Sequence, residues 1–176
     1  MLQKIKVCAA IGTMLLATGV VACAQQKPAS PPGKAEVTLK GQQVTITYGR
    51  PSMRGRKIFG GLVPYGQRWR TGANESTTLT TGTDFDIGGA NVPAGKYTLD
   101  TIPSEGTWKL IINKQTGQWG TEYNQGQDLA RVDMQKSKLE QPVEEFTISF
   151  DKKGPDSADL VLEWENTRVW VPVKAK

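Results

Sequence analysis

Residues 146–173 read FTISFDKKGPDSADLVLEWENTRVWVPV, and apolar and polar side chains alternate along most of this stretch. Alternation with a period of two is typical of β-strands that have one face in a core and the other in water. The residues at 152–155 mark a turn, and Asn166 marks a second one. We therefore expect one strand before the first turn, a second between the turns and a third after Asn166.

The same alternation extends upstream. One apolar-alternating run lies before Gly41 and another follows it, ending at Tyr48, which predicts two strands joined at this glycine. Residues 127–139 are the best candidate for a helix, although a strand fits them equally well. Counted together, about eight to ten short strands predict an all-β domain, with a β-sandwich or jelly roll as first choice and a barrel as second.

The first 22 residues are typical of a bacterial export signal, because Lys4 and Lys6 precede an apolar run that is too short to span a membrane. Val20-Val21-Ala22-Cys23 has the pattern of a lipoprotein signal. We expect Cys23 to be lipidated and to anchor the protein to a membrane of the cell envelope, facing the periplasm. The alternative is cleavage after Ala24, which would release a soluble secreted protein.

The mature chain then divides into two parts. Residues 23–34 are polar and rich in proline, and we interpret them as a tether. Residues 35–176 contain no internal repeat and no second linker, so they are expected to form one β-sandwich domain. Because Cys8 leaves with the signal, no disulfide can form within the mature chain.

Residues 48–75, YGRPSMRGRKIFGGLVPYGQRWRTGANE, form what we call the basic segment. Six basic and no acidic residues lie between Arg50 and Ala73, interleaved with aromatic residues and glycines. In an extended chain Arg68 and Arg70 project to the same side, which would let their guanidinium groups converge on one anion. We predict that the ligand-binding residues are Arg50, Arg54, Arg56, Tyr65, Arg68, Trp69, Arg70 and Asn74. The alternative is that the arginines pair with the acidic second half of the chain and the aromatic residues belong to the core.

The basic segment is also the most specific part of a family resemblance. Together with IGGANVPAGKYTLDTIP at 87–103 and WKLIINKQTGQWGTEY at 108–123, it resembles the bacterial family known as domain of unknown function 2911. The resemblance covers most of residues 40–172. It implies an exported, largely β protein, and it implies no catalytic residues.

The chain contains no histidine. This excludes histidine-dependent nucleophilic catalysis and nearly all zinc sites, and we expect neither a metal nor a cofactor. Nucleic acid is not an expected partner, because the charge is modest and the chain carries an export signal. A hydrolase acting on envelope glycans through two carboxylates is an alternative function. Its candidate acids are Glu75, Asp128, Glu163 and Glu165.

Our leading expectation is a non-catalytic envelope protein that binds an anionic or carbohydrate ligand. Arginines hold carboxylates, and tyrosine and tryptophan rings stack on sugars. A third possibility is a structural or partner-docking protein, in which the basic segment only stabilises the fold. The sequence sets no oligomeric state.

Overall fold

The computed structural model describes residues 29–176. The predicted signal peptide over 1–22 and the predicted lipidation site Cys23 lie outside these residues. Nine strands are present: β1 (Pro32–Leu39), β2 (Gln42–Gly49), β3 (Thr78–Thr81), β4 (Phe85–Ile87), β5 (Ala90–Val92), β6 (Gly95–Ile102), β7 (Trp108–Asn113), β8 (Asp128–Lys152) and β9 (Ser157–Ala175). A single turn of 3-10 helix, η1 (Gln125–Gln127), precedes β8, and no helix within 29–176 is long and apolar enough to cross a membrane.

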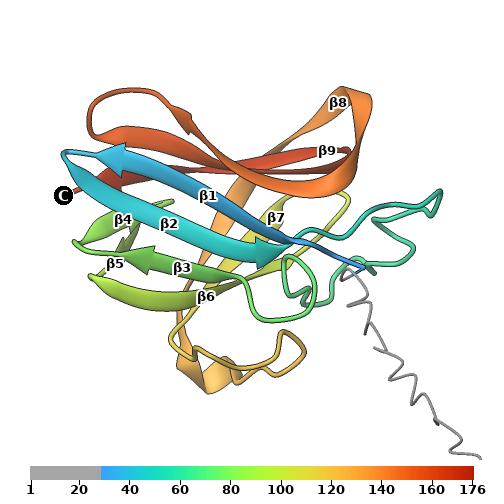
Figure 1. The fold of residues 1–176 in the computed structure, drawn as a ribbon, viewed down its shortest axis with the longest axis horizontal. Helices are drawn as coiled ribbons and strands as arrows, with labels where there is room; N and C mark the ends of the chain where they lie inside the picture. The colour runs from blue at the N-terminus through green and yellow to red at the C-terminus, as the bar shows by residue number, and fades with distance from the viewer. Residues whose placement is uncertain (1–28) are drawn as a thin grey trace, which may run out of the picture.

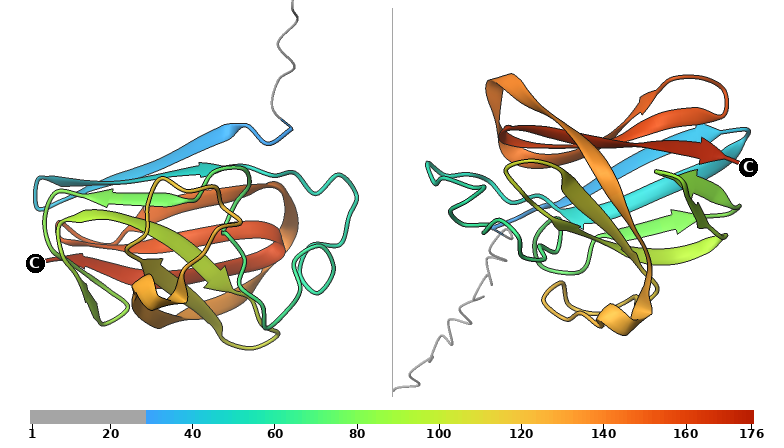
Figure 2. Two further views of the ribbon diagram at one scale, coloured as in Figure 1. Left: turned by 90° about the horizontal axis from the view of Figure 1, so that it is seen from below. Right: turned by 180° about the vertical axis from the view of Figure 1, so that it is seen from behind.

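The strands form one antiparallel sheet in the order β1-β2-β3-β6-β7-β8-β9-β4-β5. The sheet folds over at the long strand β8, which pairs with β7 through residues 128–134 and with β9 through residues 135–152. The result is two layers that face each other, with β1, β2, β3 and β6 opposite β9 and the second half of β8 (Figures 1 and 2). The predicted all-β, sandwich-like fold is confirmed.

Apolar side chains at alternating positions of the strands fill the space between the layers. In β2, Val44, Ile46 and Tyr48 are buried, and in β9, Leu160, Leu162 and Trp164 are buried. The hydroxyl of Tyr48 also donates to the carbonyl of Ile148 in β8, at 3.3 Å, and accepts from the backbone N–H of the same residue, at 2.9 Å. These two hydrogen bonds connect the layers at the end where β2 leads into the basic segment.

Two expectations about element boundaries were wrong. Asn166 does not end a strand, because β9 continues from Ser157 to Ala175. The pairing register of β9 with β8 shifts there, and Glu165 adopts a left-handed conformation with φ of 54°, so the irregularity is a bulge within one strand. The first strand also begins at Pro32, within the stretch predicted to be tether.

Candidate functional site

The basic segment leaves the sheet after β2 and returns to it at β3, forming the long loops at one end of the molecule (Figure 1). Backbone hydrogen bonds at two places fix the course of the segment. Near its start, the N–H of Phe146 donates to the carbonyl of Pro51, and the N–H of Met53 donates to the carbonyl of Glu144. Near its end, Trp69 exchanges two backbone hydrogen bonds with Thr101 of β6, at 2.7 and 2.9 Å. Both halves of the segment are thereby held against strands.

A cluster of aromatic rings anchors the segment more deeply. The indole of Trp69 stacks on that of Trp164, with ring centres 5.6 Å apart and planes 19° from parallel. Phe59 meets Trp108 edge to face at 4.8 Å, and Phe146 meets Trp69 at 4.9 Å. Edge-to-face and offset-stacked rings are the favoured geometries for such pairs. Trp69 therefore belongs to the core as the alternative interpretation expected, although it is only partly buried.

Above these rings lies a cavity of about 390 Å³, which we call the arginine cavity. The side chains that define it are Arg54, Arg56, Leu62, Trp69, Arg70 and Trp164. No aspartate or glutamate lines it. Within residues 29–176, no carboxylate lies within 4.0 Å of the guanidinium nitrogens of its three arginines. The arginine cavity is thus a positively charged hollow with an aromatic wall.

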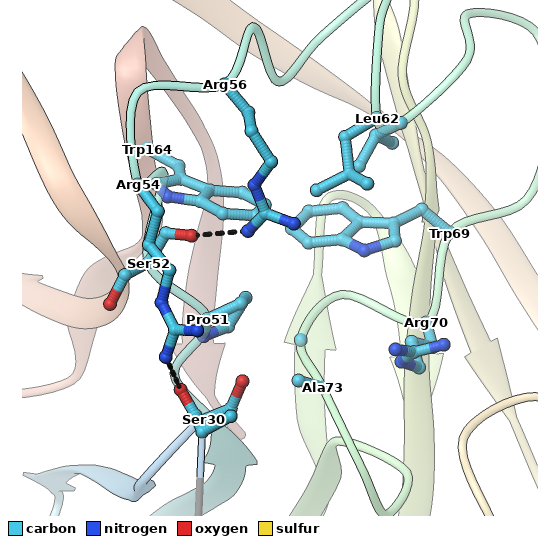
Figure 3. A pocket seen from close by; sticks show the side chains of 13 residues that line it. Ser30, Pro51, Ser52, Arg54, Arg56, Leu62, Trp69, Arg70, Ala73 and Trp164 are labelled. Atoms are coloured by element: carbon cyan, nitrogen blue, oxygen red, sulfur yellow. Dashed lines mark hydrogen bonds between the residues drawn. The ribbon is translucent and has the colours of Figure 1, made fainter.

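Backbone carbonyls orient two of the three arginines. Arg56 donates from Nε to the carbonyl of Met53 at 2.9 Å and from Nη2 to the carbonyl of Ser52 at 2.8 Å. Arg54 donates from Nη2 to the carbonyl of Ala29 at 2.9 Å. Figure 3 shows the guanidinium of Arg56 reaching toward the indole rings, with Arg54 and Arg70 on opposite sides of the arginine cavity. Neutral carbonyls thus hold these two guanidinium groups in place, and the nearest acidic contact is that of the Glu144 carboxylate, which accepts from the backbone N–H of Arg54 at 2.9 Å.

Arg70 is held by packing alone. Its Nε is buried and has no hydrogen-bond partner within residues 29–176. Its side chain passes close to Gly120, where an added Cβ would lie 2.6 Å from the Cδ of Arg70. A buried N–H without an acceptor costs free energy. An acceptor brought to this N–H would remove that cost.

The structure does not bring all the predicted arginines together. Arg50 turns toward β8, where its Nη2 lies 3.3 Å from Glu145 Oε2. Arg68 pairs with Asp100 of β6 at 2.8 Å and its guanidinium carbon lies 4.6 Å above the ring of Tyr123. Arg50 and Arg68 therefore do not line the arginine cavity with the other three predicted arginines, because acidic residues of β8 and β6 pair with them.

Asp100, the partner of Arg68, has a strongly perturbed pKa. Its side chain is 1% exposed, and burial raises its pKa to about 6, although the charge of Arg68 and the hydrogen bond from it act in the opposite direction. Its Oδ2 is buried with no partner within the described chain. Asp100 does not line the arginine cavity. Its position was not predicted, because the alternation of β6 would place it on the solvent side.

The other predicted residues have separate positions. Tyr65 is 36% exposed and does not line the arginine cavity. Asn74 adopts φ of 65° and donates from Nδ2 to the carbonyl of Ser30 at 3.1 Å. Trp164, by contrast, lines the arginine cavity but was assigned only to a strand, since nothing near it in sequence distinguishes a core tryptophan from a ligand-facing one.

Three of the four candidate acids for a hydrolase are engaged in structural contacts. Glu163 pairs with Arg168 at 2.6 Å, and Glu165 accepts from the backbone of residues 58 and 59. Asp128 accepts from Tyr123 at 2.8 Å and pairs with Arg131, also at 2.8 Å. Among these four acids, Glu75 alone is exposed and forms no ion pair within residues 29–176.

Comparison with known proteins gives one match. The family model described as "Protein of unknown function (DUF2911)" matches residues 30–173, which confirms the resemblance of the basic segment and its companions. No curated protein and no solved structure matches the chain.

Proposed function

Because this chain belongs to the DUF2911 family of proteins of unknown function, we propose its function from its own residues. We infer that it is a non-catalytic binding module, and that the arginine cavity holds the anionic group of a ligand. One observation carries this inference: three arginines and no acidic residue line the same cavity. Like charges around one hollow repel each other, and a bound anion removes that repulsion.

The shape and the groups of the cavity fit a small oxyanion. A carboxylate, phosphate or sulfate accepts paired hydrogen bonds from the planar guanidinium fork. Its volume of about 390 Å³ lies within the usual range for small-molecule sites. The partly buried ring of Trp69 and the exposed side chain of Leu62 offer an apolar surface for the rest of the ligand.

We predict that D-glucuronate and inorganic sulfate bind the protein saturably, and that Arg70→Gln weakens both about 10–100-fold, because charge-assisted hydrogen bonds contribute about 1.5–3 kcal/mol. Isothermal titration calorimetry, with tryptophan fluorescence as a second signal, measures the dissociation constants. Arg131→Gln is the matched control, since it removes the same charge from an arginine outside the arginine cavity. Its affinities should equal those of the wild type.

Two outcomes would contradict this function. If Arg70→Gln and Arg131→Gln weaken the binding of the probes equally, the effect comes from the net charge of the protein and not from the arginine cavity. Loss of folding in Arg54→Gln, Arg56→Gln and Arg70→Gln, with no binding of either probe to the folded wild type, would instead support a structural role for the basic segment.

We further propose that this binding takes place at the bacterial cell envelope, on a protein anchored through lipidated Cys23. The export signal and the lipoprotein pattern at 20–23 support this location. In cells fed a palmitate analogue that can be tagged, the full-length chain should be labelled and should sediment with membranes. Cys23→Ser should lose the label and move to the soluble fraction, whereas Cys8→Ser should retain both properties. An unlabelled wild type that is found in the soluble fraction would support secretion instead.

A further inference from the structure

A second hollow adjoins the arginine cavity. It has a volume of about 1130 Å³ and is lined by residues from the ends of β1 and β2, from 73–78 and from 117–119. We call it the Trp119 groove. Ala29, Ser30 and Ala73 line both hollows. The groove therefore lies next to the arginine cavity, with these three residues between them.

Trp119 is an unusual surface residue. Its side chain is 51% exposed, the largest value for a large apolar residue within the described chain. Its backbone is nevertheless fixed: it forms a bridge with Glu75, and the N–H of Gly120 donates to the carbonyl of Asn74 at 3.0 Å. Ser76 adds a bond from its hydroxyl to the carbonyl of Gln118, at 2.8 Å. An indole left in water on a rigid support gains little for the fold, and it is well suited to receive a ligand ring.

The walls of the Trp119 groove differ from those of the arginine cavity. They carry hydroxyl and amide groups, together with Lys34, which pairs with Glu36, and the exposed carboxylate of Glu75. The polar groups come from Ser30, Thr47, Asn74, Ser76, Thr78 and Gln118. Such groups donate to and accept from hydroxyls. The groove lacks the continuous positive charge that a nucleic-acid backbone requires.

We propose that the Trp119 groove and the arginine cavity form one site for an acidic oligosaccharide. A neutral sugar unit stacks on the indole of Trp119, and the acidic group of a neighbouring unit lies between Arg54, Arg56 and Arg70. The position of the acidic group rests on the anion-binding function proposed above. The position of the neutral unit rests on the groove alone, so the two can be tested separately.

The test compares three probes: D-glucuronate, a hyaluronan tetrasaccharide, which alternates neutral and acidic units, and neutral N-acetylchitotetraose. Titration calorimetry on the wild type should show the hyaluronan tetrasaccharide binding at least about 10-fold more tightly than glucuronate, because ring stacking and groove contacts add to the same anion site. Trp119→Ala should remove this gain and leave the glucuronate affinity unchanged. Trp170→Ala is the matched control, because it makes the same change at a partly exposed tryptophan outside both hollows, and it should change neither affinity.

The outcomes separate the two proposals. The oligosaccharide site is overturned if the hyaluronan tetrasaccharide binds no more tightly than glucuronate. It is also overturned if Trp119→Ala keeps the higher affinity for the tetrasaccharide. Neither result contradicts the anion cavity. Tetrasaccharide binding that is unaffected by Arg70→Gln, or matched by N-acetylchitotetraose, would overturn the placement of the acidic unit. The anion cavity is overturned only if Arg70→Gln also leaves the binding of sulfate and glucuronate unchanged. If sulfate binds and neither glucuronate nor the tetrasaccharide does, the sugar ligand is excluded and the anion cavity remains.

Discussion

Replacing Trp164 with alanine is expected to lower the free energy of unfolding by about 3–5 kcal/mol, the usual cost of deleting a buried tryptophan. Its side chain is 1% exposed and stacks on Trp69. Its indole N–H donates to the carbonyl of Glu144 at 3.1 Å. The substitution therefore leaves a void between the two layers and removes the donor to that carbonyl.

Urea denaturation followed by far-UV circular dichroism measures this loss. Trp119→Ala is the matched control, because the same deletion at a 51% exposed site should change the free energy of unfolding by no more than about 0.5 kcal/mol. A loss below about 1 kcal/mol for Trp164→Ala would show that the rings around it do not form a packed core.

The expected cost of Trp164→Ala bears on the site as well as on the fold. Trp164 lies on β9 and Phe146 on β8, whereas Phe59 and Trp69 lie in the basic segment. Their rings pack within one cluster, so the arginines of the segment are carried by the same side chains that hold the layers together. Loss of Trp164 should loosen Arg54, Arg56 and Arg70 and weaken sulfate binding even where the protein stays folded.

The alternation of apolar and polar residues predicted the strands correctly where a strand pairs with its neighbour in the sequence. The runs on either side of Gly41 became the hairpin of β1 and β2, in which Val37 lies opposite Val44. It failed at Asn166, because both halves of β9 pair with the same long strand, β8, and local sequence does not reveal a distant partner. Residues 127–139 had no decisive periodicity, and pairing with β7 and β9 makes them a strand.

The site was predictable in outline and not in detail. The concentration of arginines in the basic segment identified the region, and Arg54, Arg56 and Arg70 do line one cavity. Arg50 and Arg68 could not be excluded from it, because their carboxylate partners, Glu145 and Asp100, come from strands far along the chain. Trp119 was missed, since an isolated tryptophan in a loop gives no pattern.

Asp100 should make the stability of the protein fall as the pH rises from about 4 to about 6. Burial raises the pKa of this carboxyl to about 6 in the folded chain, whereas an unfolded aspartate has a pKa of about 3.9. Between these values the folded state binds more protons than the unfolded state, so each step up in pH favours unfolding. A difference of about two pKa units corresponds to about 3 kcal/mol. At neutral pH, ionised Asp100 therefore opposes folding even though Arg68 lies 2.8 Å away.

Asp100→Asn isolates this effect, because the amide has nearly the same shape and does not ionise. Urea denaturation of both proteins from about pH 3.5 to pH 7.5 should show the stability of Asp100→Asn relative to the wild type increasing by about 3 kcal/mol across the window from about pH 4 to pH 6. Asp133→Asn is the control, since Asp133 is an exposed carboxylate paired with Lys109 at 2.6 Å, and its relative stability should vary by less than about 1 kcal/mol. A flat difference for Asp100→Asn would mean that Arg68 compensates fully for burial, so that ionisation of Asp100 neither stabilises nor destabilises the fold in this range.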